Sequence, residues 1–359
     1  MTHDFHALRI AAVRRETRDC VSLGLEVPQG QVAAFAYKPG QHLAVRAMLE
    51  GEEVRRTYSI SSGPDDALVW ITIKRVPGGA FSTWAHESLR AGGTLESLPP
   101  SGRFVLPESD GTARRMIAVA AGSGITPVIS ILENMLAREP RGQATLIYGN
   151  RAVDDIVFRE RIEALKDRNL GRLQVMHVLS RDAEADVPLL AGRIDAEKLR
   201  AILATVPRSE HDHAFLCGPD TLIKTARQAL LDLGMTQQAI HFEYFRAGPR
   251  TASRPRPSLS PDEPAAVGAE AVAIVDGTRR TFRIGADQHV VDAALAQGIK
   301  LPYSCKGGMC CTCRAKLVEG EVTMDRNFSL ETWEMEAGFV LTCQARPTTP
   351  RVVLDYDQV

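Results

Sequence analysis

The segment SCKGGMCCTC at residues 304–313 contains four of the chain's seven cysteines. Cys305, Cys310, Cys311 and Cys313 lie within nine residues, and another cysteine, Cys343, follows in the segment VLTCQA. An odd total of cysteines argues against a disulfide framework. Thiolates gathered this closely are typical of sites that bind metal or carry out redox chemistry. We therefore expect such a site in the C-terminal part of the chain.

The spacing of these cysteines indicates the kind of site. Cys305, Cys310 and Cys313 form a C-x4-C-x2-C pattern, and Cys343 follows after 29 intervening residues. This is the ligand order of a plant-type 2Fe–2S cluster, which needs four thiolates arranged as two pairs. Cys311 is out of register with the pattern and is predicted not to be a ligand. Two alternatives stay open at this point, a structural zinc site and unliganded buried cysteines.

Two glycine-containing turns are candidates for nucleotide binding. The segment AAGSGITP places Gly122 and Gly124 between a predicted strand and a predicted helix, where backbone N–H groups and the helix dipole could hold a pyrophosphate. The segment AFLCGP places Cys217, Gly218 and Pro219 at the end of a second strand, and such strand ends are where parallel sheets bind ligands. A tight turn without a ligand and an ordinary buried cysteine are the alternatives.

A hydroxyl and a guanidinium follow another predicted strand. Ser180 and Arg181 come directly after HVL, where many dinucleotide-binding proteins place an acidic residue for the ribose 2′-hydroxyl. A serine beside an arginine suits a 2′-phosphate instead. We therefore expect NADPH to be preferred over NADH, with NADH still possible. The alternative is a solvated loop arginine.

The N-terminal region carries residues suited to a second, larger cofactor. In RRTYSISS, Arg56 and Tyr58 project to the same side of one extended stretch, with Ser59 beside them. A guanidinium can bind a diphosphate, and a phenol ring can stack on a planar heterocycle. Farther along, Gly79 and Ser82 stand at a predicted helix start, which is a possible anion site. Taken singly, each could be an ordinary surface strand or helix cap.

The elements that must position these residues fall into four segments. Residues 1–108 are rich in predicted strands and turns and favour a small antiparallel β-barrel. Residues 109–247 alternate short apolar runs with helical stretches, as in a parallel α/β sheet. Residues 248–268 contain five prolines and little apolar content, which is typical of a linker. Residues 269–359 show a predicted hairpin, a short helix and further strands around the cysteine loop.

Two further features of the sequence restrict its function. Gly307 and Gly308 allow the cysteine loop to adopt positive φ and to point N–H groups at sulfur.

With 359 residues, a formal net charge of −1 and no long basic run, the chain predicts several domains and no nucleic-acid partner. The most apolar segment, MIAVAAGSGITPVISIL, is interrupted by glycine and proline, so we expect no membrane association and a cytoplasmic location. The histidines are scattered, and we expect any oxygenation to occur on another protein.

Residues 1–247 resemble the ferredoxin-NADP reductase superfamily, because PGQHL, RRTYSIS, GGAFSTW, AAGSGITP, YGNR, LCGP and FEYF occur in that superfamily's order. The resemblance implies FAD in the barrel, with FMN in some relatives, and it implies that Ser59, Cys217 and Glu243 are the catalytic residues. The cofactor-binding residues implied are Arg56, Tyr58, Ser59, Gly79, Ser82 and Phe245 for the flavin, and Gly122, Gly124, Thr126, Cys217, Gly218 and Pro219 for the pyridine nucleotide, with Ser180 and Arg181 at its 2′-phosphate.

Residues 269–359 resemble a plant-type ferredoxin domain, which implies a β-grasp fold with the metal ligands Cys305, Cys310, Cys313 and Cys343. The stretch from SCKGGMCCTC to TCQARP is similar to the reductase subunits of ring-1,2-phenylacetyl-CoA epoxidases. That resemblance implies transfer of electrons from NADPH through FAD and a 2Fe–2S cluster to the separate di-iron oxygenase complex of phenylacetate catabolism. The alternatives are a reductase for another aromatic or alkane oxygenase, and a non-enzymatic iron–sulfur carrier with a decayed flavin module.

Overall fold

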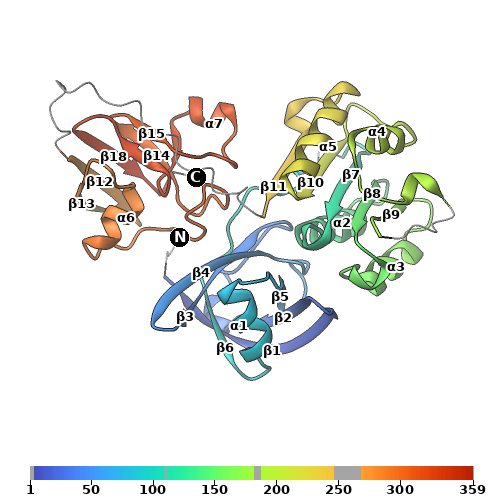
Figure 1. The fold of residues 1–359 in the computed structure, drawn as a ribbon, viewed down its shortest axis with the longest axis horizontal. Coiled ribbons are helices and arrows are strands. Elements are labelled where there is room, and N and C mark those ends of the chain that lie inside the picture. The colour runs from blue at the N-terminus through green and yellow to red at the C-terminus, as the bar shows by residue number, and fades with distance from the viewer. Residues whose placement is uncertain (1–3, 110, 182–186, 246–267, 359) are drawn as a thin grey trace. The chain divides into compact units, whose positions relative to one another are not determined.

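The computed structural model describes residues 4–109, 111–181, 187–245 and 268–358 (Figure 1). The chain divides into two compact units, one made of residues 6–54 and 58–245 and the other mainly of the C-terminal residues. The predicted linker, residues 248–268, lies outside the described residues except for Gly268. Among the helices of the described residues, none is long and apolar enough to cross a membrane.

An antiparallel sheet of six strands makes up the first part of the larger unit. Its order is β4-β3-β6-β1-β2-β5, and an antiparallel bridge between Ile60 and Ile71 joins the end of β4 to β5 and closes the barrel. Leu8, Leu23 and Leu43 are fully buried inside it, so the predicted barrel is confirmed. The elements are β1 (His6–Thr17), β2 (Cys20–Glu26), β3 (His42–Leu49), β4 (Glu52–Ser59), β5 (Val69–Lys74), α1 (Ala80–Ser88) and β6 (Thr94–Ser97).

A parallel sheet of five strands follows, in the order β11-β10-β7-β8-β9. Helices cover both faces: Val128 and Ile162 pack on one side and Leu199 and Ile223 on the other. The predicted α/β sheet is thus confirmed. The chain adds β8 and β9 on one side of β7 and then β10 and β11 on the other, and such sheets bind ligands at this switch between β7 and β10. The elements are β7 (Arg115–Ala121), α2 (Ile125–Arg138), β8 (Gln143–Asn150), α3 (Arg159–Arg168), β9 (Leu173–Leu179), α4 (Ala196–Ala204), β10 (His213–Gly218), α5 (Asp220–Asp232) and β11 (Ile240–Tyr244).

The C-terminal unit contains a mixed sheet in the order β13-β12-β18-β14-β16, with β12 and β18 parallel. Helix α6 packs Val290 and Ala294 against this sheet, which gives the expected β-grasp arrangement. The predicted hairpin turns at Asp276 and Gly277, both with positive φ, as a two-residue Asp-Gly turn requires. The elements are β12 (Ala269–Val275), β13 (Thr278–Ile284), α6 (Val290–Ala296), β14 (Arg314–Glu319), β15 (Val322–Met324), α7 (Thr332–Glu336), β16 (Phe339–Leu341), β17 (Ala345–Pro347) and β18 (Arg351–Asp355).

A buried ion pair fastens α7 to the mixed sheet. Arg314 Nε lies 3.0 Å from Glu334 Oε1, and the two side chains are 9% and 0% exposed. The Arg314 guanidinium also lies 3.4 Å from the centroid of the Phe339 ring. Because Arg314 directly follows Cys313 in the sequence, this pair also fixes the backbone beside the cysteine loop.

Replacement of Arg314 by Met is expected to destabilise the C-terminal unit by about 3 kcal/mol, because it leaves the Glu334 carboxylate buried without its cation. Denaturant unfolding of the full chain, followed by a probe in this unit, measures the change. Arg351→Met is the matched control: its pairs with Glu270 and Glu319 are about half exposed, and its loss should cost less than about 1 kcal/mol. Equal effects of the two substitutions would contradict the expectation.

Candidate functional site

The four cysteines of the predicted ligand set lie as two pairs. The side chains of Cys305 and Cys310 are hydrogen-bonded to each other, and so are those of Cys313 and Cys343. Within the described residues, no group of three or more histidine, cysteine or acidic side chains is placed to hold a single metal ion. A structural zinc site gathers four ligands around one ion, whereas a 2Fe–2S cluster takes two thiolates at each iron. The arrangement therefore fits a 2Fe–2S cluster and disfavours a zinc site.

The backbone of the cysteine loop turns its N–H groups toward the sulfurs. The Gly307 N–H donates to Cys305 Sγ at 3.3 Å. Gly308 has φ +76°, as expected for this loop, and its N–H is directed at Cys343. Lys306 also has positive φ, +45°, which the residue type did not predict. Peptide N–H groups gathered around the sulfurs favour thiolates, which is the form that binds metal.

Hydrogen bonding within each pair shifts the pKa values of its two thiols in opposite directions. The hydrogen bond with Cys310, together with backbone N–H groups, lowers the pKa of Cys305 to about 5. The same hydrogen bond raises the pKa of Cys310 well above its usual value. In the other pair, the hydrogen bond with Cys313 lowers the pKa of Cys343, and the pKa of Cys313 is raised well above its usual value.

Cys311 lies apart from the two pairs. Its Sγ is 3.0 Å from Ser329 Oγ, and its backbone has φ +54°. The positive φ rotates the chain between Cys310 and Cys313, so that these two sulfurs can belong to different pairs. The geometry accords with the prediction that Cys311 is not a ligand.

The two predicted nucleotide turns meet at the carboxyl ends of β7 and β10. A Cβ atom added to Gly124 would lie 2.1 Å from the carbonyl oxygen of Cys217, so only glycine allows this approach. Gly122 has φ +52°, and its carbonyl accepts a hydrogen bond from the Tyr148 hydroxyl at 2.9 Å. The Cys217 thiol is fully buried, and burial, with a smaller effect of the Glu243 charge, raises its pKa well above the usual value. Cys217 is therefore a neutral thiol at the switch point of the sheet.

Two hydroxyls expected at ligands are hydrogen-bonded within their own turns. Thr126 Oγ1 donates to the Ser123 carbonyl at 3.0 Å. Ser82 Oγ accepts from the Val76 N–H at 3.0 Å and donates to the Gly79 carbonyl at 3.2 Å. Helix α1 begins directly after Gly79, as the sequence predicted. These hydroxyls shape the turns, and the start of a helix such as α1 presents N–H groups that can bind an anion.

Three residues predicted to be catalytic come together where the barrel meets the parallel sheet. Ser59 Oγ, at the end of β4, donates to Glu243 Oε2 at 3.1 Å, and Glu243 on β11 is in register with Cys217 on β10. His42 was missed in the sequence: its side chain is 2% exposed, and its Nδ1 lies 3.6 Å from Glu243 Oε1. The only sequence signal for it was its place in the PGQHL motif. The Glu243 carboxylate thus accepts a hydrogen bond from a serine and lies near a buried histidine.

The remaining predicted flavin residues lie on β4 and directly after β11. Arg56 and Tyr58 lie on β4, Arg56 exposed and Tyr58 half-buried, with the Tyr58 ring 5.8 Å from that of Phe81 on α1. Phe245 follows β11 and packs against the core beside α2. An exposed guanidinium and a half-buried phenol on one strand suit the diphosphate and the ring system of a dinucleotide.

Ser180 and Arg181 follow β9 at the carboxyl edge of the same sheet. The Ser180 N–H donates to the Asn150 carbonyl at 2.9 Å, and the Arg181 N–H donates to the Arg151 carbonyl at 2.8 Å. These bonds hold the loop against the end of β8, and the Arg181 side chain is exposed. Residues 182–186 lie outside the described part of the chain.

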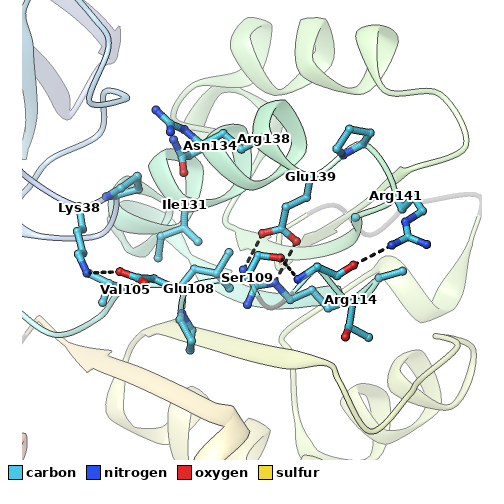
Figure 2. Close-up of a pocket in the computed structure, with 18 of the residues that line it drawn as sticks. Lys38, Val105, Glu108, Ser109, Arg114, Ile131, Asn134, Arg138, Glu139 and Arg141 are labelled. Carbon is cyan, nitrogen blue, oxygen red and sulfur yellow. Dashed lines mark hydrogen bonds and ion pairs between the residues drawn. The ribbon is translucent and has the colours of Figure 1, made fainter.

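A cavity of about 670 Å³ lies elsewhere in the larger unit (Figure 2). None of the predicted cofactor residues lines it. Four of its charged side chains form two ion pairs: Lys38 Nζ lies 3.3 Å from Glu108, and Arg114 makes two bonds to Glu139 at 2.6 and 3.0 Å. Its volume alone therefore does not make it a cofactor site.

Three family models match the chain. Residues 7–106 match the oxidoreductase FAD-binding domain, residues 118–228 the oxidoreductase NAD-binding domain and residues 273–348 the 2Fe-2S iron-sulfur cluster binding domain. They fall on the barrel, the parallel sheet and the mixed sheet respectively. The chain is therefore a flavin and iron–sulfur oxidoreductase that uses a pyridine nucleotide.

Relatives narrow this class. The chain is 42% identical over 355 residues to a subunit of the 1,2-phenylacetyl-CoA epoxidase of Escherichia coli (strain K12), covering 98% of each chain. It is 36% identical over 354 residues to the 3-ketosteroid-9-alpha-monooxygenase ferredoxin reductase component of Rhodococcus rhodochrous, covering 97% of this chain and 96% of the relative. The chain belongs to this family of oxygenase reductase components.

Solved structures share the fold. Phthalate dioxygenase reductase superposes with a TM-score of 0.61 at 24% identity, covering 98% of both chains. An intact type IV self-sufficient cytochrome P450 monooxygenase superposes with a TM-score of 0.71 at 22% identity over 98% of this chain. The chain spans about 41% of the length of that monooxygenase. At these identities the likeness concerns the fold alone.

Replacement of Cys311 by Ser is expected to leave the iron and sulfide content of the purified chain unchanged, because its sulfur lies against Ser329 and outside the two pairs. Serine at Cys305, Cys310, Cys313 or Cys343 should remove most of the iron and sulfide, because each loss leaves one iron with a single thiolate. Iron and sulfide analysis with the visible absorption spectrum measures this. A Cys311→Ser protein without a cluster would show that the ligand set is wrong.

Proposed function

We propose that this chain is the NADPH-dependent reductase component that supplies electrons to the oxygenase of a phenylacetyl-CoA epoxidase. The observation that carries the proposal is its 42% identity to a component of the Escherichia coli enzyme of that kind, over 98% of both chains. When bound, FAD takes up two electrons as hydride and releases them singly, and a 2Fe–2S cluster carries one electron at a time. The proposed modules are residues 1–108, 109–247 and 269–359, joined by residues 248–268.

In this proposal, the Ser59, Glu243 and Cys217 group is where the nicotinamide meets the flavin. Ser59 holds the Glu243 carboxylate in one position, with His42 Nδ1 3.6 Å from its other oxygen, so the carboxylate is available to accept a hydrogen bond or a proton at the flavin. Cys217 is neutral and fully buried, so it adds no charge beneath the surface on which the nicotinamide ring is proposed to lie. Exclusion of water by such a surface protects hydride transfer from side reactions.

The other proposed contacts are made to the remaining parts of the flavin and of the pyridine nucleotide. Arg56 and the N-terminus of α1 at Gly79 bind the flavin diphosphate, and Tyr58 stacks on the flavin. The nucleotide pyrophosphate lies on the turn that begins at Gly122. The remaining proposed cofactor-binding residues are Ser82, Gly124, Thr126, Ser180, Arg181, Gly218, Pro219 and Phe245. In the C-terminal unit, Cys305 and Cys310 hold one iron, and Cys313 and Cys343 hold the other.

Replacement of Arg181 by Ala is expected to raise the KM for NADPH about tenfold more than the KM for NADH. The reason is that a charge-assisted hydrogen bond to the 2′-phosphate, of about 1.5 kcal/mol, is lost with one nucleotide only. Steady-state kinetics with ferricyanide as acceptor measure both constants. The control is Arg208→Ala, an exposed arginine before β10 and therefore at the amino end of the strands, which should change neither constant. Equal increases for both nucleotides would remove Arg181 from the 2′-phosphate site.

The acceptor is tested by adding the purified full chain to the oxygenase of a phenylacetyl-CoA epoxidase. NADPH oxidation should then depend on phenylacetyl-CoA. Full-length Cys343→Ser is the matched control: it should still reduce ferricyanide with NADPH, because hydride transfer to the flavin needs no iron, but it should not support the oxygenase. A Cys343→Ser chain that drives the oxygenase at the normal rate would show that electrons do not leave through the cluster.

A second acceptor has one observation in its favour, namely 36% identity to the reductase component of a 3-ketosteroid-9-alpha-monooxygenase. The same assay with that oxygenase and its steroid separates the two proposals. Turnover with the steroid system and none with phenylacetyl-CoA would replace the first acceptor by the second. Reduction of ferricyanide without turnover of either oxygenase would leave the reductase activity established and reject both acceptors.

A further inference from the structure

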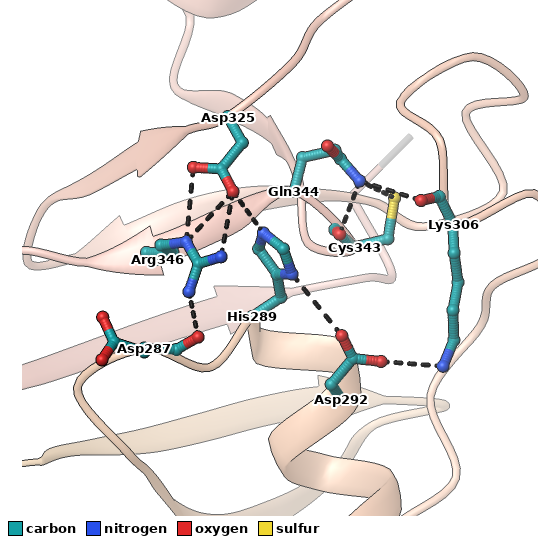
Figure 3. Close-up of polar contacts among 8 residues, drawn as sticks. All are labelled: Asp287, His289, Asp292, Lys306, Asp325, Cys343, Gln344 and Arg346. Carbon is teal, nitrogen blue, oxygen red and sulfur yellow. Dashed lines mark hydrogen bonds and ion pairs between the residues drawn. The ribbon is translucent and has the colours of Figure 1, made fainter. Parts of the chain in front are cut away.

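Gln344 connects the two segments that carry the paired cysteines (Figure 3). It follows Cys343, and its side chain is 5% exposed. Its Nε2 donates to the Lys306 carbonyl at 3.0 Å and to the Cys343 carbonyl at 2.8 Å, and it lies 3.7 Å from Cys343 Sγ. One buried amide therefore bridges the turn after Cys305 and the strand end at Cys343.

Both N–H hydrogens of the Gln344 amide are engaged in hydrogen bonds. A side-chain amide has two N–H donors, and here one serves Lys306 while the other is shared between the carbonyl and the sulfur of Cys343. The amide thus favours negative charge on the Cys343 sulfur.

The Lys306 turn is also held from its other side. Lys306 Nζ lies 2.7 Å from Asp292 Oδ1, and Asp292 lies 3.5 Å from His289 Nδ1. His289 Nε2 in turn lies 2.8 Å from Asp325, which pairs with Arg346 at 3.0 Å. These groups are partly exposed, and exposed ion pairs contribute little to stability. The buried Gln344 amide is therefore a restraint on the turn that solvent does not weaken.

We propose that Gln344 is a positioning residue that holds the Lys306 turn against Cys343 and raises the reduction potential of the 2Fe–2S cluster. Reduction adds negative charge that is shared with the cysteine sulfurs, and an N–H directed at a sulfur stabilises that charge. Without the amide, the reduced cluster is less stable relative to the oxidised cluster, and the reduction potential is lower. The inference rests on Cys343 being a cluster ligand, which the iron content of Cys343→Ser tests separately.

The test is Gln344→Met, which keeps the length of the side chain and removes both donors. The midpoint potential of the cluster, from an anaerobic spectroscopic titration of the full chain, should become more negative. The expected change is up to about tenfold in the one-electron equilibrium constant, or about 59 mV. Release of iron to a chelator should also be faster than in the wild-type chain, because the Lys306 turn has lost its restraint.

Gln297→Met is the matched control, since Gln297 also donates to two carbonyls of the C-terminal unit, those of Arg283 and Ala293. It should retain the wild-type potential. Gln344→Glu, with a carboxylate in place of the donor, should have a potential more negative than that of Gln344→Met. Failure of Gln344→Met to take up a cluster, while Gln297→Met takes one up, supports the positioning role, and Gln344→Glu then reports on the potential. A full cluster at the wild-type potential in either Gln344 variant would overturn the proposal.

Discussion

The hydrogen bond from Ser59 to Glu243 is the contact on which the geometry of the larger unit depends. It joins the last residue of a barrel strand to an edge strand of the parallel sheet. The residues that follow β4 continue this joint, because the Ser62 carbonyl accepts from Ser130 Oγ at 2.6 Å and the Ser61 carbonyl accepts from Arg161 at 2.9 Å. A flavin strand and a nucleotide sheet are thereby held as one body around the predicted catalytic residues.

Cysteine has two opposite roles in this chain, and the surroundings of each thiol determine which one it takes. At Cys217, burial in an apolar strand raises the pKa and keeps the thiol neutral beside the proposed nicotinamide site. At Cys305, a hydrogen bond from Cys310 and the backbone N–H groups lower the pKa to about 5. The neutral thiol at Cys217 suits hydride transfer, which needs no metal, and the lowered pKa at Cys305 suits the binding of iron. In the proposed function, the same side chain thus supports a two-electron step and a one-electron step in different modules.

Local spacing was enough to predict the features that depend on it. The cysteine pattern indicated four ligands, and the structure arranges them as two pairs; the turns at Gly124 and Cys217 were expected at one sheet edge, because parallel strands end on the same side. His42 and Gln344 could not be predicted, since each acts through a contact that depends on the folded chain. The hydroxyls of Ser82 and Thr126 were expected at ligands, but a sequence does not show that a hydroxyl is already bonded within its own turn.

The close approach of Gly124 to Cys217 also bears on how this scaffold can change. Because a single methyl group at Gly124 would lie 2.1 Å from the Cys217 carbonyl, no larger residue fits there without separating β7 from β10. Substitution of Gly124, at the centre of the sheet, is therefore not a way to change the nucleotide preference. Such a way remains open at the margin of the sheet, at Arg181 after β9, whose side chain is exposed. Directed evolution of this reductase would accordingly conserve the glycine turn and diversify the margin.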